Sequence, residues 1–344
     1  MTAVRPRTSR RVWTAARMLG GAAILAVIVS RLGTGPFLQG LSAVRGWSLA
    51  AAAGIAVITT VCSAWRWSLV ARGLGVAVPL RTATAAYYRS QFLNTVLPGG
   101  VLGDVERAVR HGRDAGDVGR GLRAVAWELS AGQVVQLALA LSVLLLLPSP
   151  VPLSVSLVVA AAVVGALGGV LLIRGLRPRG TSPWARTLRA AGTDLQVGLL
   201  TKRSWPGIAL ASIVVVAGHL VTLFVAAHAA GVTSSTLQFL PLAMLLLVAM
   251  AVPTNIGGWG PREGMAAWAF GAAGLGAAQG VATATVYGVL ALAATLPGAL
   301  LIAAAWLRHR RHRGNAAGPL RRDLPASASG LVPAAARTEG GVRG

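Results

Sequence analysis

Long apolar runs, separated by short polar or Arg-rich segments, make up most of this chain. Several are candidate membrane crossings, because a helix needs about 20 mostly apolar residues to cross a ~30 Å hydrocarbon core. So many apolar runs do not fit into one water-soluble core. The pattern therefore predicts an all-α, polytopic membrane protein. The runs are 18–33, 46–65, 124–147, 151–173, 206–230, 237–253 and 281–307.

The first run is the weakest candidate, because Arg17 and Arg31 enclose only the apolar segment from Met18 to Ser30. Long arginine stems reach the membrane interface and extend such a helix. A basic leader before a short apolar segment also describes a signal peptide, but no convincing small-residue cleavage site follows it. We interpret 18–33 as a crossing, with a cleaved leader as the alternative.

Two segments do not fit simple crossings. The moderately apolar segment 82–97 ends in a Pro/Gly-rich turn at 98–103, and 237–253 ends in a similar turn at 253–260. Each turn has a proline, a Gly-Gly pair and a further glycine, and charged residues follow. Pro and Gly interrupt helices, and irregular backbone at membrane depth is tolerated only where protein or a wet cavity covers it. We expect both segments to be re-entrant hairpins that line an interior site.

The two hairpins occupy matching places in the chain. In repeat 1, about 46–147, a crossing, a hairpin and another crossing follow in order, and repeat 2, about 206–307, has the same order. One crossing, 151–173, separates the repeats, so the second must be upside down. Paired Gly/Pro-interrupted segments in inverted halves indicate a transporter's midplane site. The sequence thus predicts about six full crossings and two re-entrant broken-helix hairpins in an inverted repeat.

Charge is concentrated between the apolar runs. The chain has 32 basic and 9 acidic residues and a formal net charge of +23. Basic loops mark the cytoplasmic side of a membrane protein, and their spacing follows the crossings, which argues against a nucleic-acid surface. We therefore place these blocks in the cytoplasm and predict no nucleic-acid partner. The blocks are 1–17, 66–123, 174–203 and 308–322.

This charge distribution predicts a multi-pass protein with both termini in the cytoplasm. The abundance of Arg and Ala with almost no Lys is typical of a GC-rich bacterial genome, so we expect a bacterial inner membrane. The domains expected are a basic N-terminus (1–17), a transmembrane domain (18–307) and a disordered basic tail (308–344). Trp65, Trp67, Tyr87 and Tyr88 are interpreted as interfacial anchors, as aromatic belts usually are.

The hairpin turns carry the candidate chemistry. A broken helix exposes free N–H groups and the positive end of its dipole, which favour an anion such as phosphate. Arginine adds a fork suited to phosphate, and acidic residues balance it or accept a cationic head group. Ionisable groups at membrane depth are costly, so a functional role is considered first. The candidate substrate-binding residues are Arg89, Asn94, Pro98, Gly99, Gly100, Gly103, Asp104, Glu106, Arg107, Glu128, Pro253, Asn255, Gly257, Gly258, Gly260, Arg262 and Glu263.

Structural roles are the alternative for the charged candidates. Asp104, Glu106, Arg107 and Arg110 fit the start of a cytoplasmic helix with local ion pairs. Arg262 and Glu263 fit an ion pair that braces the turn. Glu128 fits equally well as a site residue and as the partner of a neighbouring arginine. The sequence leaves these alternatives open.

The sequence contains no soluble catalytic motif. It has no Walker loop, Cys/His cluster or nucleophile elbow. His219 and His228 are too far apart around a helix for one metal site and are interpreted as interior polar groups. We therefore predict no cofactor, no metal and no catalytic residue. An intramembrane reaction on a lipid phosphate through Asp104 or Glu106 is the alternative.

Two motifs together resemble the membrane region of lysylphosphatidylglycerol synthases and their stand-alone flippase-like relatives, over roughly 15–308. The motif residues are Tyr88 to Gly100 with Gly103-Asp104, and Pro253, Gly257-Gly258, Gly260 and Arg262-Glu263. The resemblance implies that residues 89–107 and 253–263 surround a lipid head group. The lipid implied is an aminoacylated phospholipid or a polyprenyl-linked one.

The resemblance implies lipid translocation without lysyl transfer. Full synthases carry a soluble aminoacyl-transfer domain after the membrane region, and the tail 308–344 is too short to be one. We therefore expect a lipid or lipid-linked-substrate flippase that is not an enzyme. The alternative is a non-transporting partner that docks a separate synthase or glycosyltransferase through its basic loops. The sequence does not predict an oligomeric state.

Overall fold

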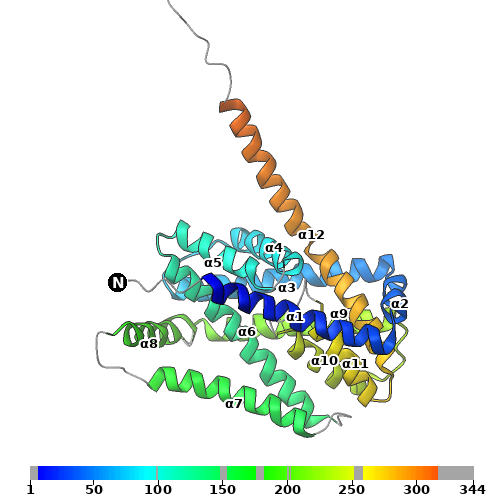
Figure 1. Ribbon diagram of the computed structural model, residues 1–344. Helices are drawn as coiled ribbons and strands as arrows, with labels where there is room; N and C mark the ends of the chain where they lie inside the picture. Colours follow the sequence, from blue (N-terminus) through cyan, green and yellow to red (C-terminus); the bar gives the residue numbers. More distant parts are fainter. Residues whose placement is uncertain are drawn as a thin grey trace, which may run out of the picture. The chain divides into compact units, whose positions relative to one another are not determined.

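The computed structural model describes residues 7–97, 100–147, 153–175, 182–199, 201, 203–251 and 259–316. Within these ranges the regular elements are helices (Figure 1). They are α1 (Arg7–Leu32), α2 (Gly35–Ala43), α3 (Gly46–Gly73), α4 (Leu80–Val96), α5 (Leu102–Asp114), α6 (Val118–Leu146), α7 (Leu153–Gly175), α8 (Pro183–Asp194), η1 (Leu195–Leu199), α9 (Trp205–Ala229), α10 (Thr236–Met250), α11 (Pro261–Ala272) and α12 (Ala277–Ala316).

Four of these helices, α3, α6, α9 and α12, are long and apolar enough to cross a membrane. The pair α1 and α2, bent by 98°, is a further candidate if both belong to one span. The prediction of a polytopic, all-α membrane protein is confirmed. The crossing expected at 151–173 corresponds to α7, which has 23 residues, and its crossing of the membrane stays a prediction.

The order of helix lengths is the same in the two halves of the chain. The first half, from α1 to α6, consists in order of a long helix, a short helix, a long helix, two hairpin helices and a long helix. The same order runs from α7 to α12, with the short turn η1 added after α8. The predicted repeats correspond to the last four helices of each half. The similarity in helix order also includes the two helices that precede each predicted repeat, and the repeats themselves stay a prediction.

Helices α3 and α9 hold equivalent places in the two halves and pack in opposite directions. Thr59 of α3 lies against Gly218 of α9, and Leu69, further along α3, lies against the earlier residue Gly207. A side chain at Gly218 would overlap the Thr59 methyl group. Small residues allow such close helix packing in membranes. The antiparallel pair is the arrangement that an inverted repeat requires.

Both interrupted segments fold as helical hairpins, α4 with α5 and α10 with α11. A Cβ atom at Gly103 would overlap the carbonyl of Ser90, so glycine is needed for α5 to begin this close to α4. Gly100 (φ 63°) and Gly260 (φ 117°) have positive φ angles, which favour glycine. The remaining turn residues, 98–99 and 252–258, lie outside the described residues.

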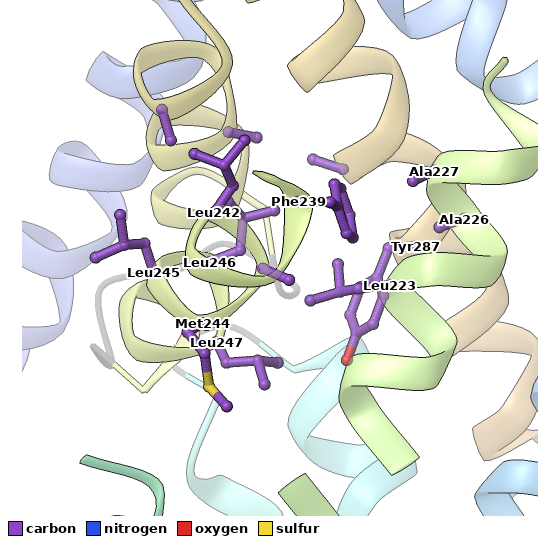
Figure 2. Packing of buried hydrophobic residues seen from close by; sticks show 14 of the residues in the cluster. Leu223, Ala226, Ala227, Phe239, Leu242, Met244, Leu245, Leu246, Leu247 and Tyr287 are labelled. Carbon is purple, nitrogen blue, oxygen red and sulfur yellow. The ribbon is translucent and has the colours of Figure 1, made fainter. Parts of the chain in front are cut away.

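The largest buried apolar cluster holds the second hairpin against α9 and α12. Leu223 of α9, Phe239 of α10 and Tyr287 of α12 belong to it (Figure 2). The Phe239 ring meets Phe224 and Phe270 edge-on, with centroids 4.7 and 6.0 Å away. Such aromatic pairs contribute about 0.5–1.5 kcal/mol beyond their buried area. Close packing is needed to hold these helices together, because lipid chains are as apolar as the side chains and provide no hydrophobic driving force between helices.

Three local predictions differ from the structure. Helix α1 begins at Arg7, within the predicted N-terminal segment, and α12 continues past the predicted end at Leu307 to Ala316. The interfacial role predicted for Trp67 and Tyr87 is wrong, because only 2% and 6% of their surfaces are exposed. Their rings instead cover the buried guanidinium of Arg107, whose Cζ lies 4.7 and 4.0 Å from the two centroids.

Candidate functional site

Polar side chains of α4 fasten the start of α5. Asn94 accepts the backbone N–H of Gly103 through Oδ1 at 2.8 Å and donates through Nδ2 to Asp104 Oδ2, also at 2.8 Å. Ser90 Oγ donates to Asp104 Oδ1 at 2.8 Å. The first N–H groups of a helix lack partners within it, so Asn94 satisfies one of them from the neighbouring helix. These bonds close the first hairpin.

A more exposed link joins the same two helices. Arg89 of α4 forms an ion pair with Glu106 of α5. Glu106 also accepts from Arg110 Nη1 at 3.3 Å, one turn further along α5. Because more than a third of the Glu106 side chain is exposed, we expect this link to stabilise the hairpin only weakly.

Glu128, fully buried in α6, is the centre of an ionic network. Its Oε1 accepts from Arg66 Nε of α3 at 2.8 Å and from the Tyr87 hydroxyl of α4 at 2.7 Å. Its Oε2 accepts from Arg107 Nη2 of α5 at 3.2 Å, and the same nitrogen donates to Asp104 at 2.9 Å. Two arginines thus face two carboxylates. Buried charges need such pairing, and the pairing ties the first hairpin to α3 and α6.

Aromatic rings flank this network. Trp67 lies between Arg107 and His111, and the Trp67 and His111 rings meet edge-on with centroids 5.2 Å apart. His111 belongs to α5, which is not a spanning helix, and burial lowers the pKa of its imidazole below the usual value. A neutral imidazole avoids a like-charge contact with Arg107.

The second hairpin has a local ion pair at its turn. Glu263 accepts from Arg262 Nε at 2.9 Å through Oε1 and from the Gly260 N–H at 2.7 Å through Oε2. Both side chains are almost fully buried. Arg262 fits against α12 at Gly288, where a Cβ atom would overlap the guanidinium. In contrast to the first hairpin, the paired charges here belong to one helix.

A cavity of about 370 Å³ is lined by residues of both hairpins and of three spanning helices. Gly100 belongs to the turn of the first hairpin, and Met250 ends the first helix of the second. The spanning helices are α3, α9 and α12. The polar lining residues are Thr59, Thr60, Gln91, Asn94, Thr95, His219, Thr222, Tyr287 and Thr295, and most of the others are alanine or larger aliphatic residues.

The described part of the cavity lining is polar and has no acidic or strongly basic side chain. Among its described residues there is no Asp, Glu, Lys or Arg. Thr60 Oγ1 donates to Gln91 Oε1 at 3.1 Å, and His219 Nδ1 lies 3.0 Å from the Tyr287 hydroxyl. Asn94 connects the lining with the ionic network, because it also bonds to Asp104. The wall therefore offers neutral hydrogen-bonding groups, with the charges behind it.

The structure separates the predicted site residues into distinct groups. Asn94 and Gly100 line the cavity, while Gly103 and Gly260 lie where the second helix of each hairpin begins. The charged candidates pair with one another or with neighbouring arginines, as in the structural alternative. They are Arg89, Asp104, Glu106, Arg107, Glu128, Arg262 and Glu263. Pro98, Gly99, Pro253, Asn255, Gly257 and Gly258 lie outside the described residues.

Most of the polar lining was missed by the sequence analysis. The signal available was a set of polar residues on one face of otherwise apolar helices. His219 and Thr222, three residues apart, share a face of α9, and Thr59 and Thr60 interrupt an apolar part of α3. The choice of candidates followed the Pro/Gly-rich hairpin turns and the charged residues next to them, and so passed over these neutral polar side chains.

Fold and cavity together define a polytopic helical membrane protein with two broken-helix hairpins beside a polar interior space. The chain belongs to the family described as the lysylphosphatidylglycerol synthase TM region, whose family model matches residues 14–298. The match covers both hairpins and confirms the family expected from the motifs. Searches among curated proteins and solved structures gave no match.

Proposed function

We propose that this protein moves a lipid between the two leaflets of a bacterial inner membrane, and that the lipid head group passes through the cavity beside the hairpins. The acyl chains stay in the bilayer. Both termini lie in the cytoplasm in this arrangement. The chain acts as a transporter and not as an enzyme.

The observation that carries this proposal is the uncharged polar lining of a cavity within spanning helices. Polar groups at membrane depth are costly, so their default interpretation is functional. Threonine, asparagine, glutamine, tyrosine and histidine side chains bond to phosphate or hydroxyl oxygens. Sites that conduct must bind weakly enough to release their ligand. A lining whose described residues carry no free charge meets that requirement.

The charged residues support the hairpins in this proposal. The starts of α5 and α11 have the positive dipole ends that favour anions, but Asp104 and Glu263 already occupy their first turns. A phosphate-bearing head group is therefore contacted by neutral donors of the wall. The name of the family refers to the synthase of a modified phospholipid, which supports a phospholipid or a related polyprenyl-linked lipid as the substrate.

The two hairpins have different roles in this proposal. The ionic network fixes α4 and α5 to α3 and α6. The ion pair of α11 lies within one helix, and apolar packing is the main contact of that hairpin with α9 and α12. One uncharged hydrogen bond, from Gln136 Nε2 to the Leu247 carbonyl at 2.8 Å, joins the hairpin to α6. Apolar contacts can slide without leaving a charge unpaired. We therefore expect α10 and α11 to move when the cavity opens to either leaflet.

A flip assay with a matched pair of variants tests the proposal. Purified protein is placed in liposomes containing phosphatidylglycerol with a fluorescent head group, and an impermeant quencher measures its exchange between leaflets. Ala291→Trp fills the cavity, whereas Leu292→Trp changes the next residue, which lies outside the lining. We expect wild type and Leu292→Trp to flip lipid and Ala291→Trp to lose most of the rate. Equal rates in the two variants would contradict the proposal.

The other decisive outcome is that neither wild type nor either variant flips the lipid. It would exclude transport of this class of lipid and favour the membrane-partner function considered from the sequence. Capture of a synthase or glycosyltransferase, lost when the arginines of the basic loops are neutralised, would then establish that function.

A further inference from the structure

A second hollow lies between α1 and α11, apart from the cavity. Its volume is about 480 Å³, and it shares no lining residue with the cavity among the described residues. Small residues create the space, and Ile24 of α1 lies against Gly264 of α11. The lining includes Ala23, Val27 and Arg31 of α1 and Gly264, Ala267 and Trp268 of α11.

This groove opens away from the helix bundle. Val27 is 59% exposed and Trp268 is 42% exposed. From Ala23 to Leu32 the groove follows α1 for roughly 13 Å, at about 1.5 Å per residue. That length is about half of a ~30 Å hydrocarbon core. An open apolar groove on a membrane protein is covered by lipid, and this one matches the depth of a single leaflet.

Arg31 provides a charge at one end of the groove. It is the only charged residue in the described lining, and it has no carboxylate partner among the described residues. Helix α1 ends one residue after Arg31, at Leu32, and the chain then bends by 98° into α2. Guanidinium groups near helix ends reach the interface, and their fork geometry matches phosphate oxygens.

We propose that this groove binds one anionic phospholipid, with an acyl chain along α1 and α11 and the phosphate on Arg31. The binding site is separate from the cavity. It does not depend on whether the protein transports lipid, so it is tested without a flip assay.

Native mass spectrometry of the purified full chain tests the acyl-chain part. The probes are dioleoylphosphatidylglycerol, the uncharged dioleoylglycerol and inorganic phosphate. Ala23→Phe fills the groove, and Ala22→Phe places the same ring at the adjacent exposed residue outside it. We expect Ala23→Phe to lose the bound lipid, Ala22→Phe to retain it, and free phosphate not to bind. Equal lipid retention in both variants would indicate only a general lipid shell and overturn the proposal.

Arg31→Gln tests the phosphate part and leaves the apolar groove intact. We expect retention of phosphatidylglycerol to fall about tenfold, as for the loss of one charge-assisted contact, while dioleoylglycerol binding is unchanged. Arg45→Gln is the control, since Arg45 is exposed beyond α2 and does not line the groove. An Arg31→Gln protein with the wild-type preference for phosphatidylglycerol would overturn this part.

Discussion

The Tyr87 hydroxyl donates to Glu128 at 2.7 Å and so joins the first hairpin to the spanning helix α6. Arg66 of α3 and Arg107 of α5 donate to the same carboxylate. Four helices therefore meet at one buried side chain. The position of the first hairpin, and with it one wall of the cavity, depends on this carboxylate.

Glu128→Gln should strongly destabilise the protein, because Arg66 and Arg107 keep their charges and lose their shared counter-ion. Breaking a buried ion pair costs about 3–5 kcal/mol. Asp117→Asn is the control: Asp117 pairs with Arg120 at the surface, and asparagine still caps α6, so the expected loss is about 0–1 kcal/mol. Denaturant titration in detergent measures the free energy of unfolding. Similar losses in both variants would contradict the role of the network.

Gly103→Ala should separate α4 from α5, because the added Cβ atom would overlap the Ser90 carbonyl. Overpacking of this kind costs about 1–3 kcal/mol. The same substitution at Gly54 meets no atom within 4 Å, and alanine is favoured in a helix by roughly 0.5–1 kcal/mol. We expect thermal unfolding in detergent to show opposite shifts for the two variants. A Gly103→Ala protein as stable as wild type would exclude tight packing of the hairpin.

Tyr287→Phe removes the hydrogen bond to His219 at the cavity wall and keeps the aromatic ring in the core. We expect a loss of about 1 kcal/mol in the free energy of unfolding, the usual contribution of one hydrogen bond. Tyr88→Phe is the matched control, since no hydrogen bond of the Tyr88 hydroxyl occurs among the described residues. No difference between the two variants would show that the Tyr287 bond does not hold α9 to α12.

The helices and the hairpins could be predicted from the sequence, because hydrophobic run length and Pro/Gly breaks are local signals. Helix α9 (Trp205–Ala229) matches the predicted run 206–230 within one residue at each end. The short helices α2 and α8 were not predicted. They have 9 and 12 residues, too few to span a bilayer and give a hydropathy signal.

The local ion pairs Asp104–Arg107 and Arg262–Glu263 were among the alternatives that the sequence offered. The partners of Glu128 could not be predicted, because they are distant in the sequence. Arg66 and Glu128 are 62 positions apart, and nothing local in the sequence indicates their contact. The motif around Arg89 and Asn94 was correctly singled out as unusual. Its observed contacts fasten the hairpin, and only Asn94 of the two also reaches the cavity. The pattern of charge and Pro/Gly breaks identified the two hairpins, and the packing of the helices decides which of their residues line the cavity.

The central claim is that both hairpins open onto one shared cavity, and cysteine labelling tests it most directly. In a Cys62→Ser background, which removes the native cysteine, single cysteines replace Thr95 in the first hairpin and Met250 in the second, and their reaction with a water-soluble thiol reagent is measured in membranes. We predict that both cysteines react and that Ala291→Trp protects both together. Protection of neither, or of one alone, would contradict it.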